Sequence, residues 1–168
     1  INENRHLLKN RPQVYQHGDY HIGNMMIDRG GQLHVIDFNR NDYGDPWEEF
    51  NRIVWCAQKA PLFASGMVNG YFDDNVPMEF WRLLALYISS NTLSSVYWAI
   101  PFGQDEVNTM LNQAKEVLSW YDNMRNPVPT WYFKGYYLQY IDGIPFKLKS
   151  TFDFSFMKEY GTVFKVYD

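Results

Sequence analysis

The stretch of sequence that decides the fold class is His-Gly-Asp-Tyr-His-Ile-Gly-Asn at residues 17–24, followed by Val-Ile-Asp-Phe at residues 35–38. Asp19 is separated by four residues from Asn24, and a second aspartate, Asp37, ends the apolar run that follows. Short apolar runs at 25–27 and 33–36 flank a segment with two adjacent glycines, which predicts a β-hairpin. Because a hairpin returns the chain, we expect it to bring Asp37 beside Asn24.

These three side chains suit phosphoryl transfer. That reaction needs an oriented acceptor hydroxyl and magnesium ions held across the phosphates, with little covalent chemistry from the protein. Magnesium takes oxygen ligands, which the amide of Asn24 and the carboxylate of Asp37 supply. We expect Asp19, on the loop ahead of them, to accept a hydrogen bond from the acceptor hydroxyl and take its proton.

This part of the sequence, about residues 13–60, resembles the aminoglycoside phosphotransferase and choline kinase-type family. Three linked elements carry the resemblance: His17-Gly18-Asp19 with His21 and Asn24 is similar to the catalytic-loop motif, Ile36-Asp37-Phe38 to the magnesium-binding motif, and Gly44-Asp45-Pro46 to a third motif that commonly follows.

The resemblance implies a protein-kinase-like fold, Mg²⁺ as cofactor, and ATP or GTP as co-substrate. It implies transfer to a hydroxyl of a small molecule, aminoglycoside-like, choline-like or other, and often cationic. By residue, it assigns the catalytic base to Asp19, metal and nucleotide binding to Asn24 and Asp37, and support of the loop to three residues: His17, His21 and Asp45.

The family places a nucleotide lobe before the catalytic loop, yet sixteen residues precede His17 here. We therefore expect no such lobe upstream in this sequence, which leaves open whether the chain alone is active. Residues 157–168 resemble the opening strand of a nucleotide lobe, which would invert the order. No glycine-rich phosphate loop follows them.

Apolar periodicity predicts a mainly helical scaffold, with helices at about 47–59, 62–71, 78–99 and 105–124. Asp45 before Pro46 is typical of a helix start, and residues 1–11 indicate the tail of a helix. Aromatic runs at 131–133 and 136–141, with an Asp-Gly turn, indicate strands. We predict an α+β, mainly helical, kinase-like C-terminal lobe over 1–126 with a catalytic-loop β-hairpin, and an aromatic β-rich tail over 127–168.

Two other functions stay open at this stage. His17, Asp19 and His21 alternate, so in an extended segment they could bind zinc and support a metal-dependent hydrolase. A kinase-like fragment could also be a non-catalytic binding module. Four acidic residues could attract a cationic substrate, or they could only complement the helix dipole: Asp42, Asp45, Glu48 and Glu49.

Composition narrows the class of protein. The content of 46% hydrophobic and 18% aromatic residues predicts a folded domain, and a net charge of -4 argues against a nucleic-acid partner. No apolar run approaches the ~20 residues of a membrane span, and the single cysteine, Cys56, fits a reducing compartment. We expect a cytoplasmic protein that can form a homodimer or exchange domains.

Overall fold

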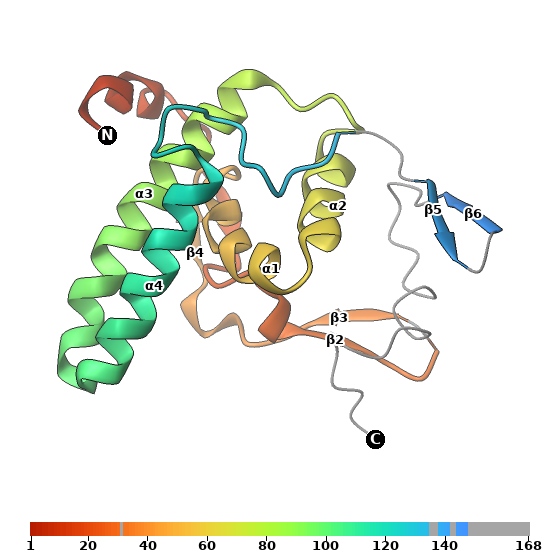
Figure 1. Cartoon of the computed structure of the whole chain (residues 1–168), viewed down its shortest axis with the longest axis horizontal. Coiled ribbons are helices and arrows are strands. Elements are labelled where there is room, and N and C mark those ends of the chain that lie inside the picture. Colours follow the sequence, from red (N-terminus) through yellow and green to blue (C-terminus); the bar gives the residue numbers. More distant parts are fainter. Residues whose placement is uncertain (31, 135–137, 142–143, 148–168) are drawn as a thin grey trace.

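The structure is a computed structural model of the chain, and it describes residues 1–30, 32–134, 138–141 and 144–147. Two long helices, α3 (Met78–Ala99) and α4 (Gln104–Trp120), run side by side along one flank (Figure 1). The shorter helices α1 (Ile53–Lys59) and α2 (Pro61–Tyr71) lie between this pair and a hairpin formed by β2 (Met25–Ile27) and β3 (Leu33–Val35). The described chain is therefore mainly helical, with small antiparallel sheets.

Short elements connect these parts. Strand β1 (Val14–Gln16) pairs antiparallel with β4 (Asp42–Gly44), and β5 (Leu138–Ile141) pairs antiparallel with β6 (Ile144–Lys147). The 3₁₀ helices are η1 (Asn2–Leu8), η2 (Ile22–Asn24), η3 (Phe38–Arg40), η4 (Glu48–Arg52) and η5 (Ile100–Phe102). The β1–β4 pair was not predicted, because each strand has three residues and neither shows a clear alternation.

The core lies where α1, α2 and α3 meet. The ring of Phe80, fully buried, packs edge-to-face against Phe50 and Trp47 at centroid distances of 5.3 and 5.6 Å. Aromatic pairs of this geometry add specific contacts to the burial of apolar area. The buried faces predicted for the helices at 47–59 and 78–99 are therefore confirmed at these positions.

Helix boundaries follow the predictions closely in α3, which spans residues 78–99 as expected. The helix predicted at 47–59 instead begins as the 3₁₀ helix η4 and becomes α-helical only from Ile53. The last helix ends at Trp120 rather than near 124, because Asp122, Asn123 and Met124 all adopt positive φ and turn the chain.

The strand predicted at 131–133 is wrong. Trp131 is buried in the core, and the backbone of 131–133 runs along α2. The Ser65 hydroxyl donates to the carbonyl of Trp131 at 3.2 Å, and the Asn69 amide donates to the carbonyl of Phe133 at 3.1 Å. Side chains of α2 therefore satisfy backbone groups that a strand partner would otherwise satisfy.

Farther along, part of the strand predicted at 136–141 is confirmed as β5. The Asp-Gly turn at 142–143 and the segment at 157–168 lie outside the described residues. The division of the chain between residues 126 and 127 stays a prediction. Within the described residues, no helix is long and apolar enough to cross a bilayer.

Candidate active site

The loop that leads into the hairpin is held from its first residue, His17, which is buried. Its Nδ1 accepts a hydrogen bond from the backbone N–H of Asp19 at 3.2 Å. Because Nδ1 is an acceptor, Nε2 carries the proton and donates to the carbonyl of Ile36 at 2.8 Å. His17 therefore ties the loop to the end of β3, directly before Asp37.

A second attachment comes from Glu49 in η4. Its carboxylate accepts hydrogen bonds from the backbone N–H of His17 at 2.6 Å and of Gly18 at 3.0 Å. Gly18 has φ +78°, and a Cβ at this position would collide with the carbonyl oxygen of Arg40. The glycine is therefore required both by its backbone conformation and by the close passage of η3.

Asp19 sits on this loop with its side chain one-fifth exposed. Its Oδ1 lies 3.3 Å from Nε of Arg52, and its Oδ2 lies 3.7 Å from Nε2 of His21. Its backbone carbonyl accepts a hydrogen bond from the amide of Asn24 at 2.9 Å. The carboxylate is thus fixed from both sides and still reaches solvent.

The predicted hairpin is present and has the expected consequence for the backbone. Met25 pairs with Val35, and the N–H of Ile36 donates to the carbonyl of Asn24 at 3.0 Å. Asp28 closes the turn, since its carboxylate accepts from the N–H of Gln32 at 3.0 Å. Asn24 therefore lies opposite Ile36 in the ladder, one residue before Asp37.

Asp37 adopts the left-handed conformation, with φ 67° and ψ 59°. This conformation is uncommon for residues other than glycine, although aspartate and asparagine tolerate it best. Among the described residues, its exposed carboxylate makes no hydrogen bond or ion pair. A rare backbone conformation at an unpaired carboxylate, one residue after the backbone partner of Asn24, is the kind of feature that clusters at functional sites.

Oxygen donors at this point fit a magnesium ion. The amide nitrogen of Asn24 donates to the Asp19 carbonyl. The amide oxygen of Asn24 therefore points away from that carbonyl and can bind a ligand. The Asp37 carboxylate supplies a second hard oxygen, and Mg²⁺ is usually held by only one or two protein groups plus phosphates and waters. The residues present therefore suit Mg²⁺.

His21 caps the 3₁₀ helix η2, which follows the loop. Its Nδ1 accepts from the N–H of Gly23 at 2.9 Å, so Nε2 carries the proton in the neutral ring and faces Asp19. Burial lowers the pKa of His21, against the opposing effect of the Asp19 charge. At neutral pH the ring is therefore uncharged.

Asp45 lies at the buried centre of a separate cluster, with 3% of its side chain exposed. Arg11 donates to it from Nε at 2.6 Å and from Nη2 at 3.1 Å. The N–H of Trp47 and the hydroxyl of Tyr87 donate at 3.0 and 2.8 Å. The predicted N-cap role differs from the structure, in which Trp47 is the N-cap of η4. Asp45 instead closes the turn before η4 and joins it to the segment after η1 and to α3.

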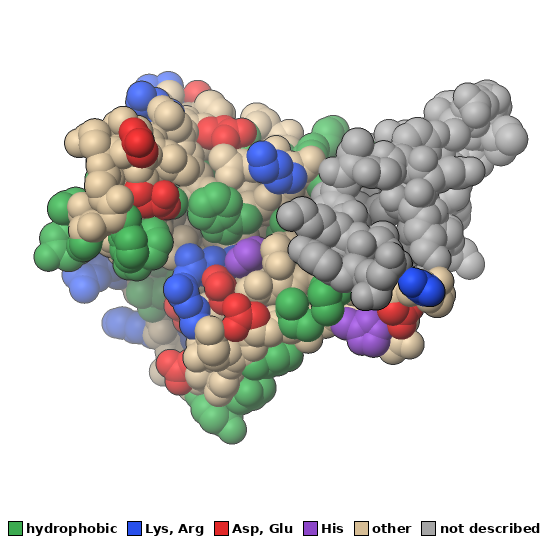
Figure 2. Space-filling view, turned by 90° about the horizontal axis from the view of Figure 1, so that it is seen from below, with side chains coloured by type: hydrophobic (Ala, Val, Ile, Leu, Met, Phe, Trp, Pro, Cys, Tyr) green, Lys and Arg blue, Asp and Glu red, His purple; other side chains and the backbone are tan. Residues whose placement is uncertain are grey.

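These contacts help to decide between the two roles considered for the acidic residues at 42–49, attraction of a cationic substrate or a structural role. Asp45 and Glu49 are both engaged by internal hydrogen bonds, whereas Asp42 and Glu48 are not bound to a basic side chain in the described structure. The face seen in Figure 2 shows acidic, basic and histidine side chains gathered together rather than a surface of one sign. The contacts favour a structural role for Asp45 and Glu49 over attraction of a cationic substrate.

The zinc interpretation meets a specific obstacle at His17, because both of its ring nitrogens are used in hydrogen bonds within the protein. Among the described residues, no three histidine, cysteine, aspartate or glutamate side chains form a group suited to hold a metal ion. Cys56 is fully buried in α1, and burial raises the pKa of its thiol to about 11. These contacts support the structural interpretation of His17.

Sequence reasoning missed Arg52 altogether, and it missed that Glu49 binds the loop. Arg52 contacts Asp19 across 33 positions of sequence, and Glu49 contacts His17 across 32. No periodicity or motif connects residues so far apart. The only sequence signal for them was that both are charged residues in the first turns of the helix predicted at 47–59.

A cavity of about 850 Å³ lies elsewhere, between η1, α3, α4 and the turn that follows α4. None of the candidate site residues lines it. The loop and hairpin, rather than this cavity, are therefore the part of the described structure where candidate reactive groups gather.

Comparison with protein-family models matches residues 2–83 to the model described as the phosphotransferase enzyme family. This range includes the candidate residues of the loop and the hairpin, and it includes Asp45 with its partners Arg11 and Trp47. No curated protein and no solved structure matches the chain.

Proposed function

We propose, from the match of residues 2–83 to the model of the phosphotransferase enzyme family, that the protein transfers the γ-phosphate of ATP or GTP to a hydroxyl group of a small molecule. The observation that carries the proposal is the placement of Asp19. Its carboxylate reaches solvent, while the same short loop and hairpin pair Asn24 with Ile36, the residue directly before Asp37.

Asp19 is the proposed catalytic base. In the reaction, the acceptor oxygen forms a bond to the γ-phosphorus, and the bond from that phosphorus to the β–γ bridging oxygen breaks. The nucleoside diphosphate leaves with the electron pair of the broken bond. The acceptor hydroxyl donates a hydrogen bond to Asp19, which takes its proton as the new bond forms and later returns it to solvent.

Asn24 and Asp37 are the proposed magnesium ligands, through the amide oxygen and the carboxylate. When bound, magnesium neutralises the charge that the phosphates carry. His17, through Ile36, keeps the end of β3 attached to the loop, so that the base and the two ligands keep one relative placement. Such fixed placement accounts for much of the catalysis in phosphoryl transfer.

The acceptor is proposed by class only. A small hydroxyl compound, aminoglycoside-like, choline-like or another, agrees with the family, and the exposed carboxylate of Asp42 would suit a cationic one. The protein is proposed to work in the cytoplasm, as a monomer or as a homodimer with exchanged segments, without nucleic acid or membrane.

The proposal is tested by transfer of labelled phosphate from ATP and from GTP. The acceptors are amino sugars, quaternary-ammonium alcohols and neutral polyols, each assayed with and without Mg²⁺. Asp19→Asn should lower turnover by roughly 10²–10⁴-fold, the usual contribution of a general base, while thermal unfolding shows that the variant is still folded. Unchanged turnover in this variant would contradict the assignment of the base.

Nucleotide binding is measured separately by calorimetry. Asp37→Asn should weaken binding of magnesium-ATP or magnesium-GTP while keeping a residue that tolerates the left-handed conformation. Asp42→Asn, which removes an exposed carboxylate from β4, is the matched control. A protein that binds neither nucleotide in the presence of Mg²⁺ and transfers phosphate to no acceptor would be a non-catalytic module.

A further inference from the structure

Arg52, the last residue of η4, makes the only cationic contact to Asp19 in the described structure. Its Nε lies 3.3 Å from Oδ1 of Asp19, and its Nη1 donates to the side-chain oxygen of Asn91 in α3 at 3.3 Å. Nε is inaccessible to solvent and makes no hydrogen bond among the described residues. The nearby carboxylate of Asp19 is therefore the group that compensates its charge.

This contact makes the two oxygens of Asp19 unequal. Oδ1 faces the guanidinium of Arg52, whereas Oδ2 faces His21 at 3.7 Å, beyond hydrogen-bond distance. The backbone of Asp19 is already fixed on both sides by His17 and Asn24. What remains to be set is the rotation of the carboxylate, and the contact with Arg52 sets it.

We propose that Arg52 is a positioning residue for the phosphotransfer reaction, which holds Oδ1 of Asp19 so that Oδ2 meets the acceptor hydroxyl. Asn91 supports this contact, because its side-chain oxygen accepts from Arg52 and anchors the guanidinium to α3. The inference rests on the proposed function, since it assigns Arg52 a role only through Asp19 as base.

A purely structural role would predict a different balance of effects. Replacing Arg52 by glutamine removes the inaccessible Nε together with its charge, and the Asp19 carboxylate that is left behind reaches solvent, so no unpaired charge stays buried in the protein. A misplacement of a reacting group by about 1 Å, in contrast, can lower a rate by ~100-fold. Loss of Arg52 should therefore affect turnover much more than stability.

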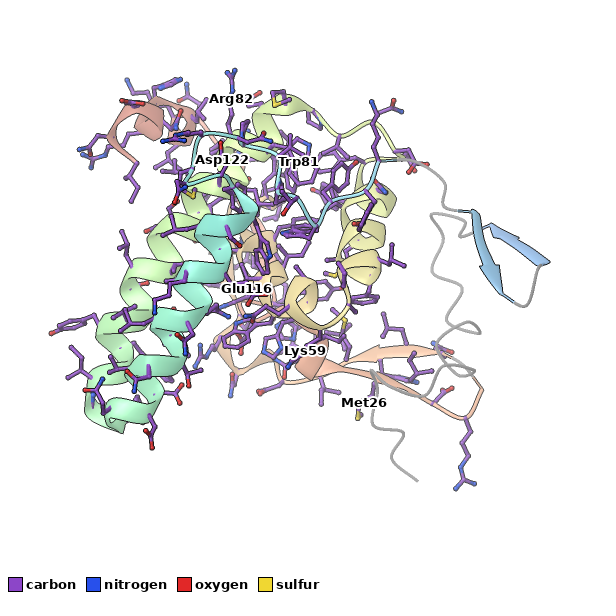
Figure 3. The ribbon with its side chains drawn as sticks, viewed as in Figure 1. Met26, Lys59, Trp81, Arg82, Glu116 and Asp122 are labelled. Atoms are coloured by element: carbon purple, nitrogen blue, oxygen red, sulfur yellow. The ribbon has the colours of Figure 1, made fainter. Side chains whose placement is uncertain are left out.

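The test compares Arg52→Gln with Arg82→Gln. Arg82 is an exposed arginine in the first turns of α3, at the end of that helix away from the β2–β3 hairpin (Figure 3). Arg52→Gln should lower kcat by about 10- to 100-fold and leave KM for nucleotide and acceptor within about twofold. Arg82→Gln should leave both parameters unchanged.

A double-variant cycle separates positioning of the base from general damage. In an Asp19→Asn protein there is no base to position, so adding Arg52→Gln should cause no further loss of the residual turnover. Asn91→Ala, which removes only the anchor, should give a smaller loss of kcat than Arg52→Gln and the same unchanged KM values.

The outcomes distinguish failure of the role of Arg52 from failure of the proposed function. If Asp19→Asn lowers turnover but Arg52→Gln leaves kcat unchanged, or if the losses in the double variant multiply, the role of Arg52 is overturned and the proposed function stands. If Asp19→Asn leaves turnover unchanged, the proposed function itself fails. A raised KM with unchanged kcat in Arg52→Gln would make Arg52 a substrate-binding residue and would also overturn the proposal.

Discussion

Arg11 and Asp45 form a two-point ion pair, in which Nε and Nη2 of the arginine lie 2.6 and 3.1 Å from the two oxygens of the aspartate. The guanidinium also stacks over the ring of Trp47, 4.0 Å from its centroid. Arg11 thus connects the segment between η1 and β1 to the turn before η4. Since Tyr87 donates to the same carboxylate, this pair holds three segments around the site loop.

Asp45→Asn should destabilise the protein strongly. Removing one partner of a buried ion pair costs about 3–5 kcal/mol in the free energy of unfolding, and we expect the lower end because Arg11 is 15% exposed. Urea denaturation measures the change. Asp105→Asn, at an exposed position in the first turn of α4, is the control and should cost less than about 1 kcal/mol. A loss below that in Asp45→Asn would contradict the role of the pair.

The same carboxylate makes stability depend on pH. Burial alone would raise the pKa of Asp45, but hydrogen bonds from Arg11, Trp47 and Tyr87 outweigh it and bring the pKa below its ordinary 3.8. A lowered pKa in the folded state contributes stability above the ordinary value, and this contribution is lost as pH falls through the folded pKa. Below about pH 4, the free energy of unfolding should fall more steeply in the native protein than in Asp45→Asn. Parallel curves would count against this.

Glu49→Gln should weaken the attachment of the loop. The amide presents an N–H₂ group to one of the two backbone donors, His17 or Gly18, so a part-buried donor loses its acceptor at a cost of about 1–3 kcal/mol. Turnover should fall with it, because the loop carries Asp19. Thermal unfolding and phosphotransfer assays measure both effects.

The matched control is Glu48→Gln, one residue earlier in the same helix. Burial and the neighbouring Asp45 and Glu49 charges raise the pKa of Glu48, so its charge is disfavoured. Neutralising it should be harmless or slightly stabilising. If both glutamine variants lose stability equally, the contacts of Glu49 with the loop do not explain the loss.

Three glycine substitutions separate steric blockage from backbone strain. Gly18→Ala should abolish turnover, since a Cβ collides with the Arg40 carbonyl. Gly103→Ala, also at positive φ but with open space around it, should cost about 1–3 kcal/mol of strain. Gly66→Ala, in open space within α2, should stabilise by up to about 1 kcal/mol. Circular dichroism and phosphotransfer assays follow all three, and a fully active Gly18→Ala protein would contradict the loop geometry.

The elements that sequence reasoning placed correctly are those governed by local rules. The hairpin register follows from two apolar runs around a turn, so the neighbourhood of Asn24 and Asp37 could be predicted. The bounds of α3 follow from its periodicity and from the proline at each end, Pro77 and Pro101. The site roles assigned to Asp19, Asn24 and Asp37 stay predictions.

The features that could not be predicted from the sequence depend on contacts between residues that are far apart in the chain. Arg52 and Glu49 contact the loop from η4, and these contacts form only because η4 packs against the loop. Trp131 has the aromatic neighbours typical of a strand, yet burial against α2 outweighs that propensity, as tertiary context commonly does. The early end of α4 depends on three consecutive residues at positive φ, a conformation that Asp122 and Asn123 tolerate but that helical periodicity does not mark.

The hold of α2 on residues 131–133 also limits when this domain can finish folding during its synthesis. The loop, the hairpin and the first helices are made early, but Ser65 waits for the backbone groups of Trp131 and Phe133, 66 and 68 positions later. At roughly 5–20 residues per second on the ribosome, that interval lasts several seconds. During it the buried face of α2 and the ring of Trp81 lack their final cover, which makes the nascent chain a candidate client for chaperones.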